Sequence, residues 1–202
     1  MPVAGLQWLP KSDILSYEEI AQIVRELAPL GLRRLRITGG EPTLRPELDL
    51  LIGMLSSIPG IEDISLSTNG VRLPELADSL KDAGLDRVNM SADSLRSDRI
   101  RSISRRNLAF DPIAAATAAE NAGLSPIKIN VVVMRGINDD EISDFAVEFP
   151  SHTIDSVFCA PIDPAALNEF AICFKLIPSF HSIREPFFIE IPIICGGIHS
   201  RK

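Results

Sequence analysis

The sequence predicts an α/β fold in which parallel strands alternate with outer helices. Short apolar strands recur at intervals of roughly 25–40 residues, with amphipathic or alanine-rich helical stretches between them. Polar or glycine-rich turns follow the strands. Such alternation arises from right-handed βα units, and it fits either an open doubly wound sheet or part of a (βα) barrel. The 202 residues are enough for one sizeable core.

The first helix should open at Ser16, because Ser16 and Glu19 have the spacing of a capping box. Gly31 should end it. The next stretch is Leu32–Pro46, LRRLRITGGEPTLRP, which predicts a strand running into a glycine turn. Two glycines allow a positive φ and close approach to a ligand. Pro46 suits the first position of a second helix.

The same alternation continues further along the chain. It predicts strands at Asp63–Thr68, Arg87–Ala92 and Ile127–Met134, and helices at about Leu73–Ala83, from Asp111-Pro112 to Gly123, and from Asp139, with a short helix or loop at Ser97–Arg105. No βα period continues after about Phe149, where the chain becomes rich in Phe and Pro. We therefore predict an α/β domain at 1–149 and a divergent, irregular tail at 150–202.

Composition restricts the possible functions. The net charge of −7 and the pI near 5.0 argue against general nucleic-acid binding. No apolar run is long enough for a membrane span, and no signal peptide is evident, so a cytoplasmic location is expected. The three cysteines contain no C-x-x-C pair and predict neither a disulfide framework nor a metal site; they are Cys159, Cys173 and Cys195.

Polar residues gather where the predicted strands end. In parallel α/β folds, ligands bind at the carboxyl ends of the strands. Arg36 and Lys128 also alternate with apolar neighbours on their strands. They are either solvated charges or charges that face an enclosed anionic ligand, since a buried charge needs a partner. The polar strand ends are Thr38–Glu41, Ser67–Asn69, Ser91–Ser94 and Met134–Gly136.

Several motifs share the order and spacing of one known family. Residues 1–149 resemble the GTP 3′,8-cyclases, radical S-adenosyl-L-methionine (SAM) enzymes of molybdenum cofactor biosynthesis. The resemblance implies an incomplete (βα) barrel with its site at the strand carboxyl ends. The matching stretches are GLQWLPKSDILSYEEI, LRRLRITGGEPTLRPEL, ISLSTNGVRL, AGLDRVNMSADSL and SPIKINVVVMRGINDDEISDFA.

The resemblance also implies roles for individual residues. The residues that it implies for SAM binding are Gly39, Gly40, Glu41 and Ser91, with Gly39, Glu41 and Pro42 also shaping the turn. Contact with GTP falls to Arg36, Ser67 and Lys128. Ser67 stands where the family usually has Thr, so the hydroxyl is kept without the methyl group.

The implied reaction is radical cyclisation of GTP. In the family, a 4Fe-4S cluster reduces SAM, hydrogen is abstracted from the ribose 3′ carbon, and that carbon joins C8 of guanine. The product is (8S)-3′,8-cyclo-7,8-dihydroguanosine 5′-triphosphate. The resemblance further implies a homodimer and a downstream partner enzyme, cyclic pyranopterin synthase.

Two departures from the family pattern lead to alternative hypotheses. The family's cluster cysteines, C-x₃-C-x₂-C, directly precede Met-Pro, and this sequence begins at Met1-Pro2. The family's second, C-terminal cluster motif is not matched either, and His152, His181 and His199 fit no ligand pattern. We therefore expect a chain without cluster ligands that is inactive alone. The alternatives are a non-catalytic nucleotide- or partner-binding remnant, a gene fragment with a wrongly assigned start, and an unrelated βα-barrel enzyme such as an aldolase.

Overall fold

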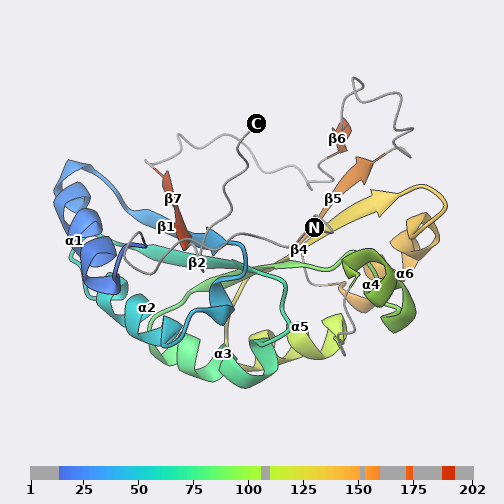
Figure 1. Ribbon diagram of the computed structural model, residues 1–202, viewed down its shortest axis with the longest axis horizontal. Coiled ribbons are helices and arrows are strands. Elements are labelled where there is room, and N and C mark those ends of the chain that lie inside the picture. The colour runs from blue at the N-terminus through green and yellow to red at the C-terminus, as the bar shows by residue number, and fades with distance from the viewer. Residues whose placement is uncertain (1–13, 106–109, 151–152, 160–171, 175–187, 194–202) are drawn as a thin grey trace. The chain divides into compact units, whose positions relative to one another are not determined.

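The computed structural model describes residues 14–105, 110–150, 153–159, 172–174 and 188–193, and it confirms the α/β fold (Figure 1). The chain divides into two compact units. The first comprises Met1–Ser67, Ser79–Asp86 and Arg184–Lys202, and the second comprises Thr68–Asp78 and Arg87–Ile183. Helix α3 (Leu73–Asp82) contributes residues to both units.

The first unit is built on parallel strands in the order β2-β1-β7. Their bounds are Arg34–Gly39 for β1, Asp63–Thr68 for β2 and Phe188–Ile193 for β7. The helices of this unit are α1 (Tyr17–Leu27) and α2 (Leu48–Ser56), with short 3₁₀ helices η2 (Ala28–Leu30) and η3 (Pro42–Leu44). Its core includes the fully buried side chains of Leu35, Ile37, Leu51, Ile52 and Leu66.

Local sequence signals explain where these helices begin and end. The capping box at Ser16 is confirmed, because Ser16 Oγ accepts from the Glu19 amide and Glu19 Oε2 accepts from the Ser16 amide. Gly31 follows η2 with a φ of 105°. The prediction that Pro46 starts the second helix is wrong, since α2 begins at Leu48. The Pro46 carbonyl instead accepts a 2.8 Å hydrogen bond from the Tyr17 hydroxyl.

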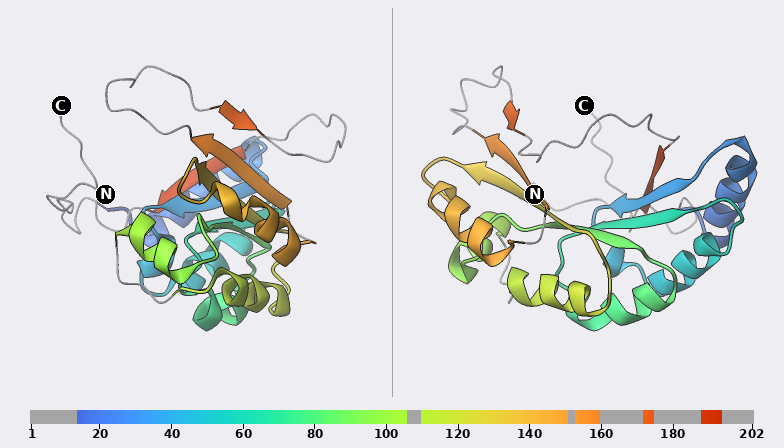
Figure 2. Two further views of the ribbon diagram at one scale, coloured as in Figure 1. Left: turned by 90° about the vertical axis from the view of Figure 1, so that its right-hand side faces the viewer. Right: turned by 180° about the vertical axis from the view of Figure 1, so that it is seen from behind.

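The second unit is built on parallel β3 (Arg87–Ser91), β4 (Ile127–Met134) and β5 (Thr153–Cys159), with β6 (Ile172–Phe174) antiparallel to β5. Helix α5 (Pro112–Asn121) runs along one face of β4, and α4 (Ser97–Ser104) lies beside α6 (Ile142–Glu148) (Figure 2). The 3₁₀ helix η4 (Asp139–Glu141) leads into α6. Asp111 caps α5 as expected, accepting from the amides of Ile113 and Ala114.

The tail differs from the sequence expectation. No strand of the sheet is expected beyond residue 149, yet β5 continues the alternation beside β4, and β7 pairs with β1 from Arg34↔Phe188 to Gly39↔Ile193. An unpaired strand edge favours the addition of another strand, and β7 takes this position on β1. The division at residue 149 stays a prediction. Cys159 and Cys173 lie in β5 and β6, whereas Met1, Pro2, Cys195, His152, His181 and His199 fall outside the described residues.

Among the described residues, no helix is long and apolar enough to cross a membrane.

Candidate functional site

In the first unit, two of the predicted GTP contacts share a polar face of β1 and β2. Leu35 and Ile37 are fully buried, whereas Arg36 between them is half-buried with a buried Nε atom. Arg36 pairs in register with Ser65, so Ser67, two residues further along β2, lies on the same face. The structure therefore brings Arg36 and Ser67 to one side of this sheet.

The glycine turn lies at the carboxyl end of β1. Gly39 ends the strand with a φ of 150°, whereas Gly40 has no positive φ. Of the two glycines, Gly39 therefore takes the positive φ that glycine allows. A Cβ added at Gly40 would meet no atom within 4 Å. The packing of the chain does not require glycine here, and the open space beside Gly40 leaves room for a ligand to approach the backbone.

Glu41 has an internal role in this turn. Its side chain is 9% exposed, and its Oε1 accepts from the Thr43 amide at 3.2 Å and from the Thr43 hydroxyl at 2.6 Å. Glu41 is thereby the N-cap of η3, which begins at the buried Pro42. These bonds agree with the turn-shaping role expected for Glu41 and Pro42, while contact with SAM stays a prediction.

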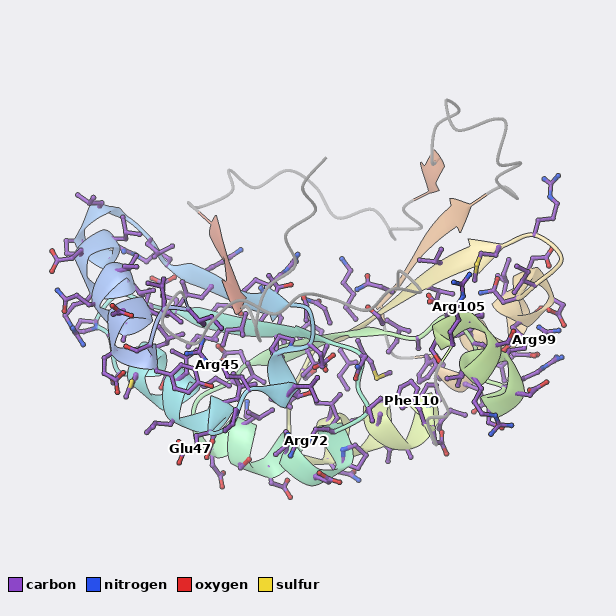
Figure 3. The ribbon with its side chains drawn as sticks, viewed as in Figure 1. Arg45, Glu47, Arg72, Arg99, Arg105 and Phe110 are labelled. Atoms are coloured by element: carbon purple, nitrogen blue, oxygen red, sulfur yellow. The ribbon has the colours of Figure 1, made fainter. Side chains whose placement is uncertain are left out.

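The far end of the same turn is fixed to the start of α1. The Arg45 guanidinium lies 4.1 Å from the centre of the Tyr17 ring, and its Nη2 donates to the Leu15 carbonyl at 2.7 Å (Figure 3). Together with the bond from the Tyr17 hydroxyl to the Pro46 carbonyl, these contacts tie Arg45 and Pro46 to the start of α1. Sequence reasoning missed these contacts, and their only signal was the aromatic residue Tyr17 beside the capping box.

In the second unit, Ser91 and Lys128 share one face of β3 and β4. The register pairs Asn89 with Lys128 and Ser91 with Asn130, so all four residues lie on the same side. Ser91 is exposed at the end of β3, and Lys128 is half-buried near the start of β4. Sequence reasoning missed Asn89, which is 6% exposed and directly opposite Lys128. The only feature of the sequence that could have indicated Asn89 is its side-chain amide inside a predicted strand.

The loop after β3 is tied to β4 and to the turn that follows β4. Asp93 Oδ1 accepts from the Val132 amide at 3.0 Å, and Asn138 Nδ2 donates to the carbonyls of Asp93 and Val132. Burial raises the pKa of the Asp93 carboxyl, and the Val132 bond partly opposes that shift. A second missed residue, Glu141, is fully buried and contacts this loop.

Gly40 in the first unit and Ser91 in the second unit are the residues expected to contact SAM. Gly40 offers an open backbone and Ser91 offers an exposed hydroxyl, and each is described within its own unit. For a cluster, the described part of the chain holds no group of three or more His, Cys, Asp or Glu residues that could bind a metal. The described donors therefore do not fit the cluster.

The comparisons with known proteins identify the family. Residues 4–148 match the radical SAM superfamily, and the chain belongs to it. The chain is 48% identical over 174 residues to the GTP 3′,8-cyclase of Moorella thermoacetica, covering 85% of this chain and 54% of that protein. It is 51% identical over 148 residues to the GTP 3′,8-cyclase of Thermodesulfovibrio yellowstonii, covering 73% of this chain and 46% of that protein. The chain thus spans about half the length of the curated relatives it matches.

A solved structure supports the fold. The fold is similar to that of Escherichia coli coproporphyrinogen III oxidase, a radical SAM enzyme, with a TM-score of 0.52 at 16% sequence identity. The match covers 69% of this chain and 35% of the oxidase. The fold expected from the sequence is confirmed, and the individual site residues stay predictions.

Proposed function

We propose that this chain carries the SAM- and GTP-contacting part of a GTP 3′,8-cyclase, the enzyme that forms the cyclic precursor of the molybdenum cofactor. The observation that carries the proposal is 48% identity to a GTP 3′,8-cyclase along 85% of the chain. Because the alignment covers 85% of the 202 residues, it includes the glycine turn, the ends of β2 and β3, and β4. These are the segments that hold every proposed contact residue.

The SAM contacts would come from the ends of β1 and β3. The space beside Gly40 would let SAM approach the backbone, since no atom of the described residues lies within 4 Å of a Cβ built there. The bonds between Glu41 and Thr43 would keep the turn in shape before the ligand arrives. Ser91 would present its exposed hydroxyl to SAM. When bound, SAM supplies the radical chemistry of the superfamily.

The GTP contacts would come from Arg36, Ser67 and Lys128. A guanidinium offers a planar donor fork and an ammonium offers a point charge, and both suit the anionic oxygens of a triphosphate. Ser67 adds a hydroxyl on the same face as Arg36. The chain has a net charge of −7, so a nucleotide triphosphate needs such local positive groups to bind.

Titration calorimetry with GTP tests this assignment. Lys128→Ala is expected to weaken GTP affinity about tenfold, equivalent to about 1.4 kcal/mol, because one charge contact to the ligand is lost. Lys81→Ala, in the last turn of α3 and outside the strands, is the matched control and is expected to leave affinity unchanged. If the two variants bind GTP with equal affinity, Lys128 does not contact GTP and the assignment is wrong.

A separate measurement distinguishes the enzyme from a non-catalytic nucleotide-binding remnant. The chain would be reconstituted anaerobically with iron and sulfide and then supplied with SAM and GTP. Formation of the cyclised nucleotide would favour the enzyme, and GTP binding without product would favour the remnant. A homodimer, a downstream cyclic pyranopterin synthase and a cytoplasmic location stay predictions from the resemblance.

A further inference from the structure

We infer that Glu141 is a positioning residue that fixes the loop after β3 and thereby the place of Ser91. The inference rests on the proposed function only in that Ser91 is assigned to SAM. All residues involved belong to the second unit. Glu141 itself is far too enclosed to meet a ligand, since its side chain is 0% exposed. Its effect on the site would pass through the loop.

The Glu141 carboxylate is the meeting point of three donors. Its Oε2 accepts from the Leu95 amide at 2.7 Å. The Ser94 hydroxyl lies 2.9 Å from each carboxylate oxygen. The guanidinium of Arg99, a residue labelled in Figure 3, donates to Oε1 at 2.7 Å. Backbone, hydroxyl and cation thus converge on one buried acid.

This arrangement requires an ionised carboxylate rather than any polar side chain. A carboxylate accepts at both oxygens, whereas glutamine presents an NH₂ group at one of them. That NH₂ group would face the Leu95 amide or the Arg99 guanidinium, donor against donor. A buried charge is tolerated only when it is paired and hydrogen-bonded, and Arg99 supplies the pairing for Glu141.

The loop between Ser91 and Leu95 is short and is held at both ends. At its start, the Ala92 amide donates to the Asn130 carbonyl at 3.0 Å. In its middle, Asp93 accepts from the Val132 amide. At its end, Ser94 and Leu95 bind Glu141. Release of the end would let the loop move, and Ser91 is only three residues away from it.

Two exposed acids lie near Glu141 in the sequence, and one of them, Glu148, provides the control variant. Asp140 also pairs with Arg99, but its side chain is 50% exposed, and exposed pairs contribute little. Glu148 lies at the end of α6 and is exposed. Glu148→Gln therefore makes the same chemical change as Glu141→Gln without touching the loop.

Hydrogen exchange on the full chain without ligand tests the inference directly. In Glu141→Gln, the amides of residues 92–96 should exchange about tenfold faster than in the unsubstituted chain, while those of α5 keep their rates. Glu148→Gln should change neither segment. Unchanged protection of residues 92–96 in Glu141→Gln would overturn the inference.

A milder variant keeps the test decisive if Glu141→Gln fails to fold. Ser94→Ala removes one donor to Glu141 and the acceptor of the Arg96 amide, and it leaves the bonds from Leu95 and Arg99 in place. It should raise the exchange rate of the Leu95 amide about threefold. No rise in that rate would also overturn the inference.

Ligand affinities separate positioning from a general loss of structure. Glu141→Gln should weaken SAM binding about tenfold in calorimetry and leave GTP affinity within about twofold. Equal losses for both ligands would indicate a general folding defect and contradict the positioning role. If the unsubstituted chain fails to bind SAM, the proposed function fails, while the exchange rates still decide the role of Glu141.

Discussion

The Thr43 hydroxyl donates a 2.6 Å hydrogen bond to Oε1 of Glu41, and both side chains are buried. The acid after the two glycines is therefore built into the turn as the cap of η3. A turn that is fixed internally is preorganised for a ligand, because little ordering remains to be done on binding.

Thr43→Val tests how much this bond stabilises the fold. Valine keeps the shape of threonine and removes the donor, so a buried carboxylate oxygen loses one of its partners. The free energy of unfolding should fall by about 1–3 kcal/mol. Urea denaturation followed by circular dichroism measures the change.

The matched control is Thr117→Val. The Thr117 hydroxyl donates to the Ile113 carbonyl at 2.8 Å on the exposed face of α5, where water can replace it. Its loss should change stability by less than about 0.5 kcal/mol. If both variants lose the same free energy of unfolding, the buried bond between Thr43 and Glu41 stabilises the fold no more than the exposed bond of Thr117 does.

Gly70→Ala should destabilise the protein. Gly70 has a φ of 77°, and an added Cβ would lie 2.5 Å from Sδ of the buried Met90 and 3.3 Å from Phe110. Backbone strain and overpacking together should lower the free energy of unfolding by about 1–3 kcal/mol. Denaturation curves of the variant and the parent chain give the difference.

Gly53→Ala should act in the opposite direction. Gly53 lies inside α2, has no positive φ, and has no atom within 4 Å of an added Cβ. Alanine in a helix interior should raise the free energy of unfolding by about 0.5–1 kcal/mol. A loss of stability here would show that α2 is packed more tightly at Gly53 than the structure indicates.

Stability should depend on pH through Asp93. Burial raises the pKa of this carboxyl above its ordinary value of 3.8, so the folded state keeps the proton at a higher pH than the unfolded chain does. The fold is favoured below the unfolded pKa, and this advantage is lost as pH rises through the folded pKa. Asp93→Asn keeps an acceptor for the Val132 amide and cannot ionise.

The comparison of Asp93→Asn with the parent chain across pH provides the measurement. The variant should be the more stable protein at neutral pH. Its advantage should shrink as pH falls from above the raised pKa towards 3.8. An advantage for the variant that is constant from pH 3 to pH 7 would argue against a titrating Asp93.

Much of the fold is predictable because its signals are local. The capping box at Ser16, the Asp111 cap and the alternation of β4 specify their elements from a few neighbouring residues, and β4 has the predicted bounds, Ile127–Met134. The apolar run that holds β7 reads as a possible strand, but its place beside β1 was not predicted, because this pairing joins segments that are distant in the sequence. Pairing of this kind depends on tertiary structure rather than on local propensity.

The candidate site was predictable only in part. The order of the motifs identifies Arg36, Gly40, Ser91 and Lys128 as candidate site residues. It does not identify the residues that surround them. Glu141 was hidden because the acidic run Asp139–Glu141 has the composition of a solvated helix start. Only the folded chain shows that Glu141, the last acid of the three, is buried against Ser94.

The affinity of Gly40→Ala for SAM tests the central claim most directly. A Cβ at Gly40 has no atom of the described residues within 4 Å, so the variant should keep the parent's unfolding midpoint. If SAM lies against this backbone, the added methyl group should weaken binding at least about tenfold in calorimetry. A variant that folds normally and binds SAM as tightly as the parent chain would contradict the claim.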